Sequence, residues 1–279
     1  MMFNFFLDNY LLLALAKEKA EPIREALARL PPPPPNGQWA NFLRNLDEAD
    51  LERLEEGERN AVMNAFAPRE EMRIFGRGIR RRLAPMLGDP ARIKMAYSLL
   101  FAMPGAPVVC YGDEIGMGED LEAKGRNAVR TPMQWRNGRN GGFSKGPKAR
   151  LVQPMVEDGP FGASSTNVET QDGDADSLLE LIRRLASIRR AHRGPGEHDC
   201  QMLQSGDAAV LALAYRAPEE ELVIIHNLAG RSTRAVIELD AMPALPPQVL
   251  LGEAVDAPIK GVLAVALKSY DFRWLSWKR

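Results

Sequence analysis

Two pairs of adjacent carboxylates stand out as residues whose types and spacing could do chemistry: Asp47 with Glu48, and Asp113 with Glu114. Two carboxylates that flank one bond can serve as nucleophile and general acid/base. Each pair also has an ordinary interpretation. Asp47 stands where a polar helix is predicted to begin, and an aspartate there is a common N-cap. Glu114 could simply be a charged loop residue, so the residues alone leave both interpretations open.

The elements around these pairs predict an α/β fold. Residues 38–44 form a short predicted strand ahead of Asp47. Residues 106–111 form a nearly all-apolar strand ahead of Asp113, a pattern typical of a parallel strand covered on both faces. A helix capped by Asp89 is predicted between the two strands. Active sites of β/α folds lie just past the carboxyl ends of the strands, where both acidic pairs fall.

The segments before and after this region are less regular. Residues 1–30 are predicted to form one helix, broken or kinked near Pro22, and a run of prolines follows it. Residues 116–176 are rich in Gly, Asn and Pro, with little periodicity, so we expect a long functional or disordered loop. Ser177 and Glu180 are spaced as a capping box for a following helix.

Beyond residue 195 the pattern changes to short strands separated by turns. Regular spacing of this kind predicts an antiparallel β-sandwich. We therefore expect a domain boundary that divides the chain into residues 1–195 and 196–279. The predicted strands are residues 210–215, 222–228, 234–239, 248–251, 262–267 and 272–277.

Composition excludes several classes of partner. The chain has 36 Lys and Arg against 37 Asp and Glu, for a net charge of −1, so no nucleic-acid partner is expected. The early apolar run at residues 10–16 is shorter than the roughly 20 residues that span a bilayer, so no membrane partner is expected either. A cytoplasmic protein with Cys110 and Cys200 reduced is the expectation.

No cofactor or metal is expected. Residues 116–118 read Gly-Met-Gly and lack the third glycine of a dinucleotide-binding motif, and residues 142–148 lack P-loop spacing. His192, His198 and His226 lie in different predicted elements, without the spacing of metal ligands.

Several ordered stretches resemble the α-amylase family of glycoside hydrolases. Residues 42–48, Phe-Leu-Arg-Asn-Leu-Asp-Glu, resemble the motif of the family's seventh barrel strand, and residues 104–117 resemble its eighth strand and loop. Residues 125–135 resemble the block that follows in trehalose synthases and related α-glucosidases. Among the subfamilies, residues 76–87 look most like trehalose synthases, which interconvert maltose and trehalose. Residues 269–274 are similar to the closing strand of the family's C-terminal sandwich.

The resemblance implies roles for particular residues. Asp47 would be the third catalytic carboxylate, which stabilises the oxocarbenium-like transition state. Asn45 would support the site, Arg130 would contact the acceptor-side glucose, and Glu114 would shape the eighth-strand loop beside the substrate. The expected substrates are α-glucosides of the maltose and trehalose type, bound once the barrel is complete.

The resemblance also shows what is missing. It implies a partial (β/α)8 barrel, made of the last three units and followed by the sandwich, whereas the family carries its nucleophile and acid/base on the fourth and fifth strands. Leu46 occupies the position of a family histidine that binds sugar hydroxyls. We therefore expect a fragment that is inactive alone. The alternatives are half of a split glycoside hydrolase, completed by an N-terminal half, and a non-catalytic carbohydrate-binding or interaction module.

Overall fold

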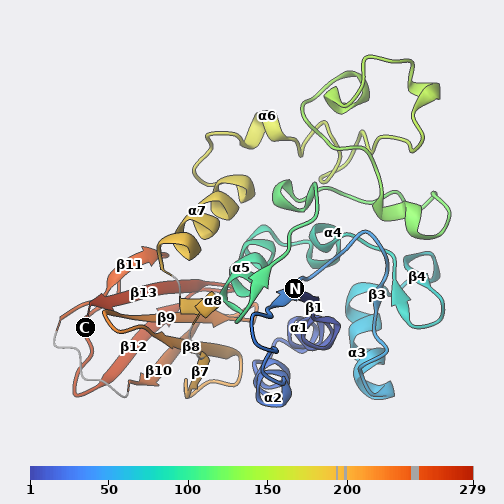
Figure 1. The fold of residues 1–279 in the computed structure, drawn as a ribbon. Helices are drawn as coiled ribbons and strands as arrows, with labels where there is room; N and C mark the ends of the chain where they lie inside the picture. Colours follow the sequence, from blue (N-terminus) through green and yellow to red (C-terminus); the bar gives the residue numbers. More distant parts are fainter. Residues whose placement is uncertain (193, 198–199, 240–244, 279) are drawn as a thin grey trace. The chain divides into compact units, whose positions relative to one another are not determined.

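The protein is described by a computed structural model that covers residues 1–192, 194–197, 200–239 and 245–278. His198 lies outside the described residues. The chain divides into two compact units, each assembled from separated segments (Figure 1). Unit 1 comprises Met1–Asn41, Lys94–Pro107 and Leu185–Arg279, and unit 2 comprises Phe42–Ile93 and Val108–Arg184. The domain boundary expected at residues 195 and 196 stays a prediction.

Unit 1 contains a small parallel sheet in the order β1-β2-β6, formed by β1 (Met2–Phe3), β2 (Trp39–Asn41) and β6 (Ala106–Pro107). Within the described residues, β1 and β6 each pair on one side only. The strand predicted over residues 106–111 pairs only at its first two residues, and residues 106–110 are partly exposed. The expectation of cover on both faces is therefore wrong, because a parallel strand is covered only where neighbouring strands and helices pack around it.

The helix predicted over residues 1–30 is instead β1 followed by two helices, α1 (Phe5–Lys17) and α2 (Glu21–Arg29). Glu18 ends α1 in the left-handed conformation, with φ 53°. Pro22 does not kink a helix but lies in the first turn of α2, where its missing N–H costs nothing. The two helices pack against each other.

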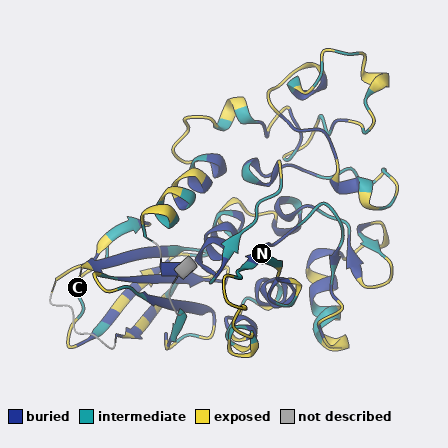
Figure 2. Cartoon of the chain, viewed as in Figure 1, coloured by how far each residue is buried: buried dark blue, intermediate teal, exposed yellow. Residues whose placement is uncertain are grey.

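The C-terminal part of unit 1 consists of two antiparallel sheets, as predicted. One has the order β11-β13-β9-β8-β7, and the other pairs β10 with β12. Side chains from both sheets share one apolar core, and buried and exposed residues alternate along β10 and β12 (Figure 2). All the predicted strands are confirmed, and only β7 was not predicted. The strands are β7 (Cys200–Leu203), β8 (Val210–Arg216), β9 (Glu220–Asn227), β10 (Thr233–Glu238), β11 (Gln248–Leu251), β12 (Val262–Leu267) and β13 (Phe272–Lys278).

Unit 2 opens with a small antiparallel sheet in the order β3-β5-β4, formed by β3 (Ala49–Asp50), β4 (Arg73–Ile74) and β5 (Gly78–Ile79). The polar helix predicted to begin near Asp47 begins only at α3 (Glu56–Phe66), where Glu55 and Glu58 form a capping box. The N-cap interpretation of Asp47 is therefore wrong, since the chain enters β3 after it.

Two longer helices follow their predicted start signals, α5 (Pro90–Ala102) and α7 (Leu178–Ala191). The Asp89 carboxylate accepts hydrogen bonds from the first backbone N–H groups of α5. The box at α7 is half formed: Ser177 Oγ accepts from the Glu180 N–H, but the Glu180 carboxylate accepts from Gly173 instead of reaching back. Local spacing thus located these helix starts correctly.

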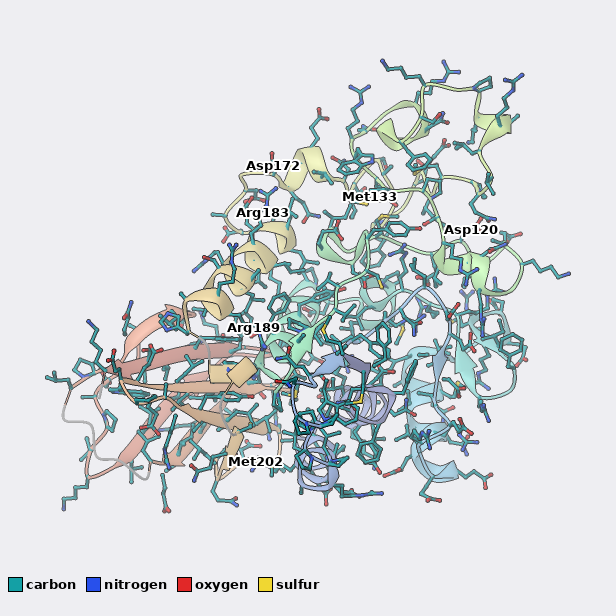
Figure 3. The ribbon with its side chains drawn as sticks, viewed as in Figure 1. Asp120, Met133, Asp172, Arg183, Arg189 and Met202 are labelled. Atoms are coloured by element: carbon teal, nitrogen blue, oxygen red, sulfur yellow. The ribbon has the colours of Figure 1, made fainter. Side chains whose placement is uncertain are left out.

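The remaining elements are short. They are α4 (Leu83–Leu87), α6 (Val168–Gln171), α8 (Gly194–Glu197) and the 3₁₀ turns Glu70–Met72, Asp113–Ile115, Gly125–Val129, Arg139–Gly142 and Lys148–Arg150. The expected long irregular stretch at residues 116–176 is confirmed. Its end is tied down by an ion pair of 2.6 Å between Asp172 and Arg183, both labelled in Figure 3. Among the described residues, no helix is long and apolar enough to cross a membrane.

Candidate functional site

Asp47 lies in the loop between β2 and β3, and its backbone is held from two directions. Asn45 Oδ1 accepts a hydrogen bond of 2.9 Å from the Asp47 N–H, an Asx turn. The buried Arg44 guanidinium donates to the Asp47 carbonyl at 2.7 Å. The Asp47 side chain nevertheless remains 48% exposed. The loop thus fixes the backbone of this residue and leaves its carboxylate open to a ligand.

Arg126 and Arg130 bring their guanidinium groups to the acidic pair. Arg130 Nη2 lies 2.5 Å from Asp47 Oδ1, and Arg130 Nε donates to the Leu46 carbonyl at 2.9 Å. Arg126 holds both oxygens of Glu48, at 2.5 and 2.9 Å, and its Nη1 lies 3.6 Å from Asp47 Oδ1. Bidentate pairing of this kind positions both partners as well as neutralising them.

The arginine contacts decide which of the two carboxylates is available. The hydrogen bond from Arg126 lowers the pKa of Glu48, which is opposite to the raised pKa that a general acid at neutral pH needs. Glu48 is therefore a structural partner of Arg126. Asp47 pairs with Arg130 through one oxygen and keeps a half-exposed carboxylate, an arrangement that can accept hydrogen bonds from hydroxyl groups of a ligand.

Leu46 offers no side-chain donor or acceptor at its position in this loop. Its backbone carbonyl instead accepts from Arg130. Arg126 and Arg130, whose side chains are 42% and 41% exposed, offer hydrogen-bond donors near Asp47.

The two carboxylates of the second acidic pair, Asp113 and Glu114, differ in how far they are buried. Asp113 is buried against Arg82 at 3.2 Å, and burial raises the pKa of its carboxyl to about 6 despite that ion pair. Burial also raises the pKa of Glu114, whose side chain lines a cavity that Arg130 lines too. Asp113 is thus part of the interior of unit 2, whereas Glu114 faces a hollow.

The structure brings together the residues singled out in the sequence. Asn45, Asp47 and Arg130 are joined by direct hydrogen bonds, and Glu114 shares a cavity wall with Arg130. Sequence reasoning missed Arg126 and its partner role for Glu48. The available signal was its position one helical turn before Arg130, in the stretch 125–135.

The part of the chain that the structure describes contains no candidate metal site. No group of three or more His, Cys, Asp or Glu side chains is placed to hold a metal ion there. His192 pairs with Glu220 at 2.7 Å, and the buried His226 lies 2.9 Å from Ser98 Oγ.

Comparisons with known proteins relate the chain to α-amylase-type enzymes. Residues 74–194 match the family described as "Alpha amylase, catalytic domain". The chain is 36% identical to the trehalose synthase of Thermus thermophilus over its whole length, which is 29% of that protein. It is 37% identical to the trehalose synthase/amylase of Mycolicibacterium smegmatis over 90% of the chain and 42% of the relative.

Solved structures with the same fold include an α-amylase from H. orenii, at a TM-score of 0.67 and 19% identity, over 99% of this chain and 48% of that one. A trehalose-6-phosphate hydrolase from Bacillus licheniformis aligns with a TM-score of 0.64 and 19% identity, over 99% and 51% of the two chains. The chain thus has the fold of the matching part of α-amylase-type enzymes. It is a homologue of the trehalose synthases and spans less than half the length of these relatives.

Proposed function

We propose that the chain is part of a trehalose-synthase-like enzyme that interconverts maltose and trehalose. The observation that carries the proposal is the hydrogen-bonded group of Asn45, Asp47 and Arg130, in a chain similar to trehalose synthases over nearly its whole length. In this proposal Asp47 stabilises the positively charged transition state. Asn45 and Arg130 hold the loop and the substrate, and Glu114 borders the acceptor side.

The small parallel sheet supports a specific place for the chain in that enzyme. β1, β2 and β6 are parallel, follow one another in order and pair on their outer sides with no other described strand. A barrel must close to satisfy its strand edges. We infer that these strands are the last three of a (β/α)8 barrel, followed by the C-terminal sandwich. Polypeptide outside these 279 residues would supply the nucleophile and the acid/base.

The 279 residues alone are therefore proposed to be inactive. Retaining glycoside chemistry needs a nucleophile and an acid/base about 5–5.5 Å apart, and Glu48, the carboxylate next to Asp47, is held by Arg126. A split enzyme, in which a separate N-terminal half completes the barrel, fits the same open strand edges. The cytoplasmic location expected from the sequence stays a prediction.

Reconstitution tests the proposal. The chain is produced alone and together with the complementary N-terminal part of a trehalose synthase relative, and conversion of maltose to trehalose is measured by chromatography. We expect conversion only with both polypeptides. Asp47→Asn should lower the rate by at least about a hundredfold, as expected when a group that stabilises transition-state charge is lost.

The matched control is Asp50→Asn. This change also removes one carboxylate from the same stretch, and the Asp50 carboxylate pairs with Arg77. The control should convert maltose at the unmodified rate. Conversion by the chain alone would contradict the proposed inactivity, and an active Asp47→Asn enzyme would contradict the role of Asp47. Sugar binding without conversion in any combination would favour a non-catalytic module.

A further inference from the structure

Phe75 is an exposed aromatic residue in a backbone conformation that bulky side chains rarely adopt. It stands at the tip of the hairpin that joins β4 to β5, with a positive φ of 54°, and Gly76 follows with φ 72°. Asn and Gly adopt this left-handed conformation readily, whereas a large side chain there is an outlier. Phe75 is also 69% exposed, so burial in an apolar core does not compensate for the strain. Strain of this kind commonly marks a functional position.

A second turn of the same form shows that the backbone itself does not need an aromatic residue. Lys260 and Gly261 have φ angles of 52° and 77°. Across them, Ile259 and Val262 exchange two backbone hydrogen bonds of 2.9 and 3.0 Å. Lys260 is exposed, and its side chain is not aromatic. The ring of Phe75 is therefore explained by a contact outside its own turn.

That contact is with the guanidinium group of Arg126. Arg126 Cζ lies 5.6 Å from the centroid of the Phe75 ring, within the roughly 6 Å at which a cation is attracted to the face of an aromatic ring. The same guanidinium donates to both oxygens of Glu48 and places Nη1 3.6 Å from Asp47 Oδ1. The ring contact thus leaves the N–H groups of Arg126 available to the carboxylates.

The hairpin also contacts the partner of Arg126. Gly78 of β5 packs directly against the Glu48 side chain, since a Cβ on Gly78 would lie only 2.9 Å from Glu48 Cγ. Any larger residue at this position would push the Glu48 side chain away. One short hairpin therefore supports both members of the ion pair, with Gly78 against Glu48 and Phe75 against Arg126.

These contacts explain why an aromatic residue stands in a strained, exposed turn. We propose that Phe75 is a positioning residue, whose ring holds the Arg126 guanidinium so that Arg126 keeps Glu48 in an ion pair and stays beside Asp47 as a donor. Phe75 acts through Arg126 and not on the reacting sugar itself. The inference rests on the proposed function, since it adds a residue that arranges the loop at Asp47.

Phe75→Asn tests this role while keeping the turn. Asn-Gly is a favoured turn sequence, so the thermal midpoint of unfolding should not fall. In the full chain, residues 1–279, the pKa of Glu48, which Arg126 lowers, should rise towards the ordinary glutamate value in an NMR titration. The Arg126 Nε–H should exchange with solvent about twofold to fivefold faster, the range expected on losing one exposed cation–π contact. Phe75→Tyr keeps a ring and should restore both values.

Lys260→Asn is the matched control. It introduces the same side chain at a residue with the same left-handed backbone, also followed by glycine. It should leave the Glu48 pKa and the Arg126 exchange rate unchanged. The proposal would be overturned if Phe75→Asn also left both values unchanged, even with a lower thermal midpoint, because the role of Phe75 would then be structural only. Equal changes in Phe75→Asn and Phe75→Tyr would overturn it too, since the ring would not be their cause.

The reconstituted enzyme separates failure of this inference from failure of the proposed function. Phe75→Asn should lower kcat/KM for maltose by about twofold to fivefold, and Phe75→Tyr should restore it. If Phe75→Asn changes Glu48 and Arg126 as expected but no reconstituted enzyme converts maltose, the proposed function fails and the contact of the ring with the ion pair stands. If the enzyme is active and Phe75→Asn leaves Glu48, Arg126, kcat and KM unchanged, the positioning role fails and the function stands.

Discussion

The C-terminal sandwich and the parallel sheet of unit 1 differ in how far their strands are paired and buried. The sandwich pairs its strands over many residues and closes an apolar core between two sheets. The parallel strands are only two or three residues long, and Phe3 of β1 is 59% exposed. The comparison teaches that the sandwich pairs its strands over long stretches and shares a core between two sheets, whereas the short parallel strands depend on neighbouring elements.

Buried and half-buried polar side chains help to hold the parallel sheet of unit 1 and the Asp47 loop of unit 2. In unit 1, Asn41 of β2 links the Asn4 side chain and the Pro104 carbonyl. In unit 2, arginines hold the acidic loop at Asp47. The following predictions test this difference, beginning with the largest expected effect.

Shortening an apolar side chain should lower the free energy of unfolding much more in the sandwich core than in the parallel sheet. Ile225 of β9 is fully buried in the sandwich core, so Ile225→Ala should lower the free energy of unfolding by about 2–5 kcal/mol through lost burial and a cavity. Phe3→Ala in β1 should change it by no more than about 0.5 kcal/mol. Urea unfolding measures both, and similar losses would contradict the comparison.

Removing the Asn41 amide should loosen the parallel sheet. This side chain is 1% exposed, accepts from Asn4 at 2.9 Å and donates to the Pro104 carbonyl at 2.8 Å. Asn41→Ala leaves buried groups unpaired and should cost about 1–3 kcal/mol. Hydrogen exchange should speed up at the β1 and β2 amides, with the sandwich amides unchanged. Asn60→Ala on the exposed side of α3 is the control and should have no such effect.

The buried histidine of the sandwich should make its stability fall in acid. Burial lowers the pKa of His226 to about 3, so the fold keeps this side chain neutral while the unfolded chain protonates it below about 6.5. Its contribution is complete above pH 6.5 and is lost as pH falls towards 3, at up to ~1.4 kcal/mol per pH unit. His226→Gln should flatten this slope in urea unfolding, and an unchanged slope would contradict the assignment.

Asp113 in unit 2 should act in the opposite direction. Burial raises the pKa of its carboxyl to about 6, so the fold favours the protonated form. Its contribution is complete below the ordinary aspartate pKa and is lost as pH rises through 6. Asp113→Asn should therefore make the loss of stability on acidification steeper between pH 6 and 4. A shallower slope in that variant would be the contrary result.

The smallest effect is expected at the exposed acidic loop. Arg126→Ala removes the hydrogen bond that lowers the Glu48 pKa, so the Glu48 pKa should rise towards the ordinary glutamate value. An NMR titration of the side-chain carboxyl measures the change. Arg69→Ala removes an arginine that pairs with Glu71 and should leave Glu48 unaffected. A Glu48 pKa that does not move would show that Arg126 does not hold this carboxylate in solution.

Local patterns predicted the sandwich strands and the helix starts well. Gln248–Leu251 and Val262–Leu267 have the predicted bounds, and Asp89 caps α5 as expected. Turn residues and the alternation of apolar and polar residues reflect interactions between near neighbours, so they can be recognised in the sequence. The length and burial of the strand predicted over residues 106–111 were overestimated. An apolar run indicates a preference for burial, but it does not indicate whether neighbouring elements are present to bury it.

The acidic loop marks the limit of prediction at the site. Asn45 and Asp47 lie two positions apart, and their hydrogen bond follows from a local turn. Arg126 and Glu48 are 78 positions apart, and no local pattern pairs them. Resemblance to a family pointed to Asp47 and Arg130, but it did not indicate that Arg126 would pair with Glu48.

The sequence by itself determined the strand positions of the sandwich and the helix caps, because these depend on local spacing. It also pointed to Asp47 and Arg130 as candidate site residues, because they lie in recognisable motifs. Only the tertiary structure decided that Asp113 is buried and Asp47 exposed, and that guanidinium groups from a distant turn hold Asp47 and Glu48. Burial and ion pairing depend on segments that meet only after the chain has folded, and that is why they could not be deduced from neighbouring residues.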